Sequence, residues 1–274
     1  MSKMFLNENG RTSKYCLLAL SLTIANTGPL FYWNTGLSAG IGTYGFVLFS
    51  VGLAYICLCL CTSELSSAFP FAGGSYGLAR CTLGYYLGFI VGCYETIYAI
   101  FSTSFAISFL AEILSQIFGT GSSFLPLYFL PLYGIPILIV SMSKRWVWVS
   151  CAVVATLSST IVIVYCLSTL SLVNAHKYAD TKHAFHGNFV SYLTLLPLGI
   201  FLFTGPEILN LCCNEVEFPR TEVPWAQVTA AIYLFLQSIC VFFISACAAP
   251  GIQELSMAVS PVADSKCDND TLVL

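Results

Sequence analysis

The chain has 274 residues, of which 57% are hydrophobic and 8% are charged, and its mean hydropathy is +0.83. Soluble domains carry roughly a quarter charged residues, so this composition excludes a soluble domain and predicts a protein of the lipid bilayer. The net charge of −3 leaves no basic surface, which excludes a nucleic-acid-binding protein.

Apolar stretches recur along the chain, and about 20 apolar helical residues cross the hydrocarbon core of a membrane. This criterion predicts seven transmembrane helices, at residues 15–37, 43–65, 84–112, 124–142, 147–172, 190–213 and 225–250. Three prolines in the fourth span are expected to kink it rather than to form a loop. The chain is therefore predicted to be an all-α polytopic membrane protein, with a tail at 1–14, a transmembrane domain at 15–250 and a polar tail at 251–274.

The basic residues indicate the orientation of the spans. If the N-terminus lies inside, seven basic residues are cytoplasmic and three are external; the seven are Lys3, Arg11, Lys14, Arg80, Lys144, Arg145 and Arg220. This excess predicts a cytoplasmic N-terminal tail and, with seven spans, an extracellular C-terminal tail. Asn269 begins the sequon "NDT" in that tail and is a candidate glycosylation site. The sequon favours the plasma membrane over an internal membrane.

The same tripeptide, Thr-Gly-Pro, interrupts the first span at residues 27–29 and the sixth at residues 204–206. Proline removes a backbone donor and blocks the preceding turn, and hydrocarbon tolerates the freed carbonyl groups only where they line a cavity. Five spans separate the two breaks, a spacing typical of a five-plus-five inverted repeat whose broken helices hold a substrate. Two ordinary proline kinks are the alternative interpretation.

We expect each proline to begin a new half-helix whose positive end points at the cavity. Carbonyl groups of the preceding half-helix are then available to an ammonium group. Because Pro29 and Pro206 carry no N–H, the site has fewer donors for a carboxylate, and its free carbonyl acceptors suit an amine better.

Three carboxylates lie in or beside apolar spans, where an ionised carboxylate costs about 2.5 to 3.5 kcal/mol and needs a partner, a proton or water. Glu207, directly after the second break, is the first candidate for cation contact or proton coupling, and complementing the helix dipole is its alternative role. Glu95 is expected to be buried against a neighbour, with a direct role as the alternative. Glu64 is expected to be structural, satisfied by interfacial water or by Arg80.

Motifs of enzymes are missing from the sequence, which has no nucleophile elbow, no phosphate-binding loop and no histidine at catalytic spacing from serine or cysteine. His176, His183 and His186 share one polar loop, and no cysteine or histidine spacing is typical of a zinc site. We therefore expect no enzymatic activity, no metal and no cofactor.

Two longer runs resemble a known family. "SELSSAFPFAGGSYGLARCTLGYYLGFIVGCYE" at 63–95 resembles the junction of the second and third spans in the amino acid-polyamine-organocation superfamily of transporters. "FTGPEILNLCCNEVEFPRTEVP" at 203–224 resembles the sixth span and following loop of that superfamily. "WNTGL" at 33–37 is similar to ethanolamine-permease-like members, whereas Gly28-Pro29 and "NEVEFPRTEVP" resemble the polyamine and L-type branches.

The resemblance implies an inverted-repeat (LeuT-like) transporter fold with broken helices one and six, and alternating access coupled to a proton or a sodium ion. The implied substrate is an amino acid, a polyamine, ethanolamine or a related small amine. Carried over by position, the substrate-binding residues are Asn26, Thr27, Gly28, Pro29, Leu30, Phe203, Thr204, Gly205, Pro206 and Glu207.

The five-plus-five fold needs more spans than the seven predicted here, so the chain is expected to be a C-terminally truncated member with the first repeat and part of the second. The alternatives are a non-transporting fragment and a membrane subunit that works only with a partner. A seven-span receptor matches the number of spans but requires the opposite orientation.

Overall fold

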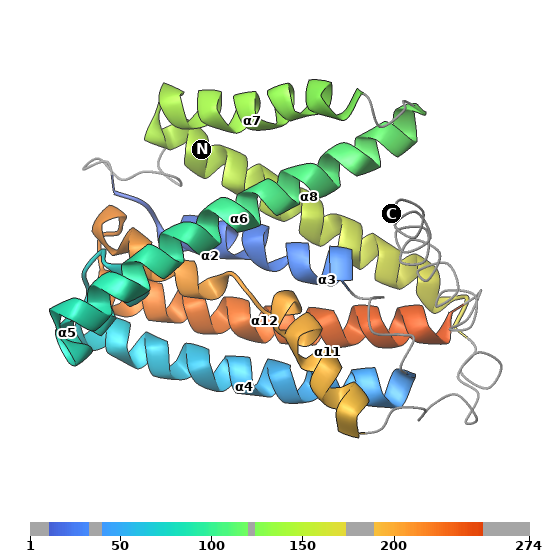
Figure 1. The fold of residues 1–274 in the computed structure, drawn as a ribbon, viewed down its shortest axis with the longest axis horizontal. Helices are drawn as coiled ribbons and strands as arrows, with labels where there is room; N and C mark the ends of the chain where they lie inside the picture. The colour runs from blue at the N-terminus through green and yellow to red at the C-terminus, as the bar shows by residue number, and fades with distance from the viewer. Residues whose placement is uncertain (1–10, 33–39, 120–123, 174–188, 249–274) are drawn as a thin grey trace, which may run out of the picture.

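The computed structural model describes residues 11–32, 40–119, 124–173 and 189–248, which are helical almost throughout (Figure 1). The elements are α2 (Lys14–Ala25), α3 (Thr27–Tyr32), α4 (Ile41–Ala68), α5 (Gly74–Leu83), α6 (Tyr85–Phe118), α7 (Leu125–Met142), α8 (Lys144–Leu170), α11 (Phe189–Leu202), the 3₁₀-helix η3 (Pro206–Glu215) and α12 (Pro219–Cys247). The predicted all-α class is confirmed.

Among the described residues, six helical segments are long and apolar enough to cross a membrane: Ile41–Ala68, Tyr85–Phe118, Leu125–Met142, Lys144–Leu170, Phe189–Glu215 and Pro219–Cys247. They correspond to the second to seventh predicted spans. The third span ends at Phe118 rather than at 112, and the seventh begins at Pro219 rather than at 225, because a helix continues past its apolar window into polar residues. The predicted first span corresponds to the shorter α2 and α3, and residues 33–37 lie outside the described ranges.

One local feature of the fold was predicted from the sequence and another was not. The fourth span is one helix, α7, which contains Pro131 and Pro136, as expected for a span rather than a loop. The short helix α5 between the second and third spans has no counterpart among the predicted helices. Its residues are too few and too polar to register as a transmembrane window.

The long helix α12 lies along α4 and also packs against α2 and α8 (Figure 1). Many of its buried residues are small, including Ala226, Ala230, Ala231, Ser238 and Ala246. Small side chains let membrane helices approach closely, and close packing is what holds helices together in lipid. These residues therefore place α12 at the centre of the bundle.

Polar side chains on buried helix faces are joined in pairs between spans. The Gln227 side-chain amide of α12 donates to the Thr62 hydroxyl of α4 at 2.7 Å. The Tyr165 hydroxyl of α8 and the Ser245 hydroxyl of α12 are 2.7 Å apart. Because lipid offers no alternative partner, these hydrogen bonds help to fix the rotation of α12 against its neighbours.

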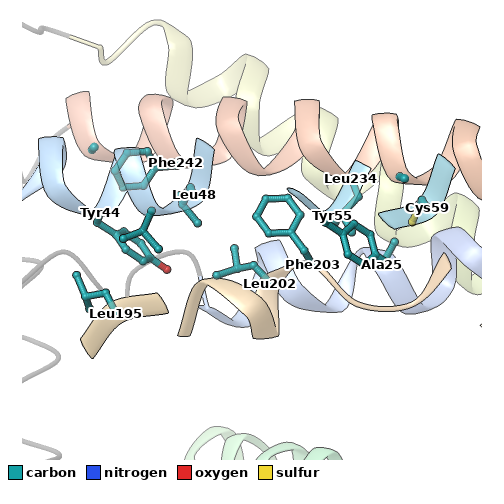
Figure 2. Packing of buried hydrophobic residues seen from close by; sticks show 13 residues of the cluster. Ala25, Tyr44, Leu48, Tyr55, Cys59, Leu195, Leu202, Phe203, Leu234 and Phe242 are labelled. Atoms are coloured by element: carbon teal, nitrogen blue, oxygen red, sulfur yellow. The ribbon is translucent and has the colours of Figure 1, made fainter. Parts of the chain in front are cut away.

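Two groups of buried side chains form the core. The α4–α12 cluster, shown in Figure 2, comprises Ala25, Tyr44, Val47, Leu48, Tyr55, Cys59, Leu195, Leu202, Phe203, Ala231, Leu234, Phe242 and Ala246. The α2–η3 cluster comprises Cys16, Leu17, Trp148, Leu209, Cys213, Val216, Val223 and Ala226. The first cluster includes residues next to both breaks, and the second occupies the start of α2 and the body of η3.

Replacing Phe242 by alanine tests the packing of α12 on α4. The Phe242 ring is 1% exposed and meets the Tyr44 ring edge-on, with centroids 5.4 Å apart. The truncation leaves a cavity, so we expect a loss of about 3 kcal/mol in stability and a lower Tm in detergent. Phe243→Ala is the matched control, because Phe243 is 51% exposed. Equal melting temperatures for the two variants would contradict this packing.

Candidate functional site

The first span is interrupted at Asn26, between α2 and α3. The Asn26 N–H still donates to the Leu22 carbonyl at 3.0 Å, so the hydrogen-bond ladder of α2 reaches the break. The next helix begins at Thr27, which makes Pro29 its third residue. The expectation that Pro29 is the first residue of a half-helix is therefore wrong. The proline is tolerated because N–H groups in the first turn of a helix have no partner within it.

The interruption of the sixth span is wider. Helix α11 ends at Leu202, and η3 begins at Pro206, as expected for a proline at a helix start. Between them, Gly205 has φ 128° and ψ −52°. This backbone conformation is open to glycine and strained for residues with a Cβ atom, which explains the glycine in the second Thr-Gly-Pro. The half-helix after the break is a 3₁₀-helix.

The two breaks lie directly against each other. A Cβ atom added to Gly28 would lie 2.3 Å from the Leu202 carbonyl oxygen. A Cβ atom added to Gly205 would lie 2.9 Å from the Ile24 Cγ2 atom and 3.2 Å from the Ala25 backbone nitrogen. Each glycine thus allows one broken span to touch the other at its break. The structure brings the two Thr-Gly-Pro segments together.

Helix α8 holds the first break in place through hydrogen bonds. The Asn26 side-chain amide donates to the Ser158 hydroxyl at 2.7 Å and to the Ser159 hydroxyl at 3.1 Å. One turn earlier, the Thr23 hydroxyl is 3.0 Å from the Cys151 carbonyl oxygen, which accepts its hydrogen bond. The Asn26 Oδ1 atom is buried and has no hydrogen-bond partner within the described part of the chain. This oxygen is an unused acceptor at the break.

Glu207 is oriented by its own break and by the second span. Its Oε2 atom accepts a hydrogen bond from the Gly205 N–H at 2.9 Å and another from the Tyr55 hydroxyl of α4. Across the ranges that the structure describes, the Oε1 atom has no hydrogen-bond partner. The carboxylate therefore lies at the break with one oxygen held and one oxygen available.

A second hydrogen bond joins η3 to α4, on the C-terminal side of the break. The Ser66 hydroxyl donates to the Asn210 Oδ1 atom at 2.5 Å, and both side chains are buried. Together with the bond from Tyr55, it fixes the sixth-span half-helix to the second span at two points. The half-helix is therefore anchored by polar contacts rather than by its short 3₁₀ ladder alone.

The candidate binding residues are distributed over both breaks. Phe203 is buried and packs its ring against Tyr55, with centroids 6.2 Å apart. Thr27 is exposed, Thr204 is half-buried and Leu30 lies in α3. The remaining residues of this group, other than half-buried Glu207, are buried: Asn26, Gly28, Pro29, Gly205 and Pro206.

The other two candidate carboxylates lie apart from this junction. Glu64 is exposed on α4 and Glu95 is half-buried on α6, and neither carboxylate has a hydrogen bond or ion pair among the described residues. Arg80 does not pair with Glu64. It lies over the Tyr85 ring, 5.0 Å from the centroid, and donates to the Tyr76 hydroxyl at 3.0 Å. Within the described ranges, Arg80 is therefore not the partner of Glu64, and Glu95 has no side-chain partner.

The sequence-derived candidates for other sites cannot be placed. The three histidines and Asn269 lie outside the described residues. Within the described ranges, no group of three or more His, Cys, Asp or Glu side chains is arranged to hold a metal ion.

Within the described residues, six helical segments long and apolar enough to cross a membrane, one of them broken at Gly205, define this chain as an integral, multi-pass membrane protein. The family profile described as amino acid permease matches residues 23–265. The chain therefore belongs to the amino acid permease family, which is a family of transporters rather than of enzymes. Comparison with curated proteins gave no match.

Replacing Gly28 by alanine tests the contact between the breaks. The new methyl group would overlap the Leu202 backbone, which cannot move as a flexible side chain can. We expect a loss of about 1 to 3 kcal/mol in stability, read as a lower Tm. Gly134→Ala on α7 is the matched control, because nothing lies within 4 Å of its added Cβ atom. The contact is absent if Gly28→Ala melts like Gly134→Ala.

Proposed function

We propose that this chain binds a small amine-bearing substrate between its two broken spans and carries it across the membrane. The observation that supports the proposal most strongly is the contact of the two breaks through Gly28 and Gly205. Interrupted helices expose backbone groups, and two interruptions side by side concentrate these groups at one point inside the membrane. Membership of the amino acid permease family supports an amino acid or a related amine as the substrate.

The chemistry of the junction favours the ammonium end of such a substrate. Two backbone positions carry no N–H, at Pro29 and Pro206, and the Gly205 N–H is already taken by Glu207. Acceptors are better supplied, because the Glu207 Oε1 and Asn26 Oδ1 atoms both lack a partner in the described structure. An ammonium group donates hydrogen bonds and accepts none, so it suits this arrangement.

Alternating access fits the way the two core clusters meet the junction. The α2–η3 cluster packs the segments before the first break and after the second. The α4–α12 cluster begins at the breaks, with Ala25 and Phe203, and extends to the opposite ends, with Tyr44 and Phe242. We propose that the clusters separate in turn, each giving a path to the junction from one side. This motion belongs to the five-plus-five inverted repeat proposed for the whole transporter.

The protein is proposed to lie in the plasma membrane. In the proposed orientation its N-terminal tail lies in the cytoplasm. The support is the excess of Lys and Arg on that side of the spans. In this orientation Lys144 and Glu215, whose Nζ and Oε1 atoms are 2.7 Å apart, join the fifth and sixth spans at the inner surface. A proton or a sodium ion is the proposed coupling ion, and Glu207 is the proposed proton site.

Uptake into proteoliposomes tests the transport proposal. Purified protein is reconstituted, and labelled leucine, lysine, putrescine and ethanolamine are supplied under a proton gradient and, separately, under a sodium gradient. We expect saturable uptake of at least one of these amines above protein-free vesicles. Folded protein that transports none of them would favour the subunit or the non-transporting fragment instead.

Glu207→Gln tests the proposed role of its charge. Glutamine keeps the shape and can still accept hydrogen bonds from Tyr55 and Gly205, so the fold should remain. We expect uptake to fall about tenfold or more, or to lose its dependence on pH, because a hydrogen bond to a charged group contributes about 1.5 to 3 kcal/mol. Glu112→Gln, on an exposed position of α6, is the control. Unchanged uptake at every pH would reduce Glu207 to a residue that complements the helix dipole.

A further inference from the structure

We infer that Tyr55 is a positioning residue for Glu207, and that it connects the second span to the charge at the sixth-span break. This inference rests on the proposed role of Glu207 as the proton or cation site. It adds a part of the molecule, α4, that lies outside both broken spans. The hydroxyl of Tyr55 donates to the Glu207 Oε2 atom, and the Gly205 N–H donates to the same oxygen.

Convergence of two donors on one oxygen makes the arrangement sensitive to charge. An ionised carboxylate accepts both hydrogen bonds, and charge strengthens each of them. When the free Oε1 atom takes a proton from water, Oε2 becomes the carbonyl oxygen of a neutral carboxyl group and can still accept both hydrogen bonds. Both bonds then lose the strength that the charge gave them. Protonation thus loosens the second span from the break.

The surroundings of Tyr55 support this role. The side chain is 9% exposed, so water competes little for its hydroxyl. Its ring packs against Phe203, which is itself part of the break, with centroids 6.2 Å apart. A movement of the sixth span at residues 203–205 therefore moves both the ring contact and the hydrogen bond. Through Tyr55, α4 contacts two parts of the same break, the Phe203 ring and the Glu207 carboxylate.

Among the described residues, Tyr55 and Cys59 of α4 and Tyr98 of α6 interact electrostatically with the Glu207 carboxylate. Helices α2 and α12 also pack against η3. Lys14 of α2 and Glu222 of α12 interact with each other.

The charge on α5, at Arg80, lies over the Tyr85 ring and is thereby directed at an aromatic face rather than at the break. Within the described residues, the carboxylate of Glu207 is therefore balanced by hydrogen-bond donors and not by a basic side chain. Loss of one of the two donors should therefore change the hydrogen bonding of the carboxylate.

Infrared difference spectroscopy of the purified protein measures this directly and needs no substrate. The carboxylate stretching band that disappears in Glu207→Gln identifies Glu207. In Tyr55→Phe we expect that band to shift in frequency, because the carboxylate loses one of its two charge-assisted hydrogen bonds. In the double variant the band should be absent.

Tyr192→Phe is the matched control. The Tyr192 hydroxyl of α11 is 3.0 Å from the Ser50 hydroxyl of α4, so this change removes a tyrosine hydroxyl between the same two spans without touching Glu207. We expect its Glu207 band to lie at the wild-type frequency. An unshifted band in Tyr55→Phe, an equal shift in Tyr192→Phe, or no carboxylate band lost in Glu207→Gln overturns the inference. Failure of every uptake assay would refute transport while leaving this spectrum intact.

Discussion

The contact between Gly28 and the Leu202 backbone is the constraint on which the rest of the site depends. A methyl group in place of the Gly28 hydrogen would lie 2.3 Å from a carbonyl oxygen, so only glycine permits this approach. The approach brings the end of α11 to the start of α3, and both elements are interrupted at this level. Interrupted helices in hydrocarbon are costly when alone. Side by side, they can share one polar environment.

The surrounding helices supply the partners that the breaks lack. Asn26 reaches Ser158 and Ser159 on α8, and Glu207 reaches Tyr55 on α4. Neither partner belongs to a broken span. The unbroken spans thus act as fixed supports, because their own backbone groups are satisfied within each helix. Such an arrangement lets the broken spans carry unpaired acceptors at the junction while the bundle stays packed.

Much of the architecture could be predicted because the membrane imposes simple rules. Hydropathy located the second to seventh spans, since each needs an apolar run of a certain length. Thr-Gly-Pro located both breaks, since proline and glycine disturb a helix wherever they stand. The pairing of the two breaks also followed from their spacing along the chain. These signals are local or periodic, and a single sequence contains them.

The contacts across helices could not be predicted in the same way. Tyr55 lies in a uniformly apolar run, and nothing beside it in the sequence marks it as the partner of Glu207. Arg80, which was one of two expected partners of Glu64 besides interfacial water, instead lies over the Tyr85 ring. Rotation and tilt are set by packing against neighbours rather than by hydropathy. The position of Pro29 in α3 was missed for a related reason, since α2 continues up to Asn26.

The central claim is that the two breaks form one binding site. The most direct measurement is a density map of the protein in lipid nanodiscs with a saturating concentration of an amine that it transports. The account predicts ligand density in contact with both residues 26–30 and residues 203–207, with the ammonium group near Glu207. Ligand density that touches neither break would contradict it.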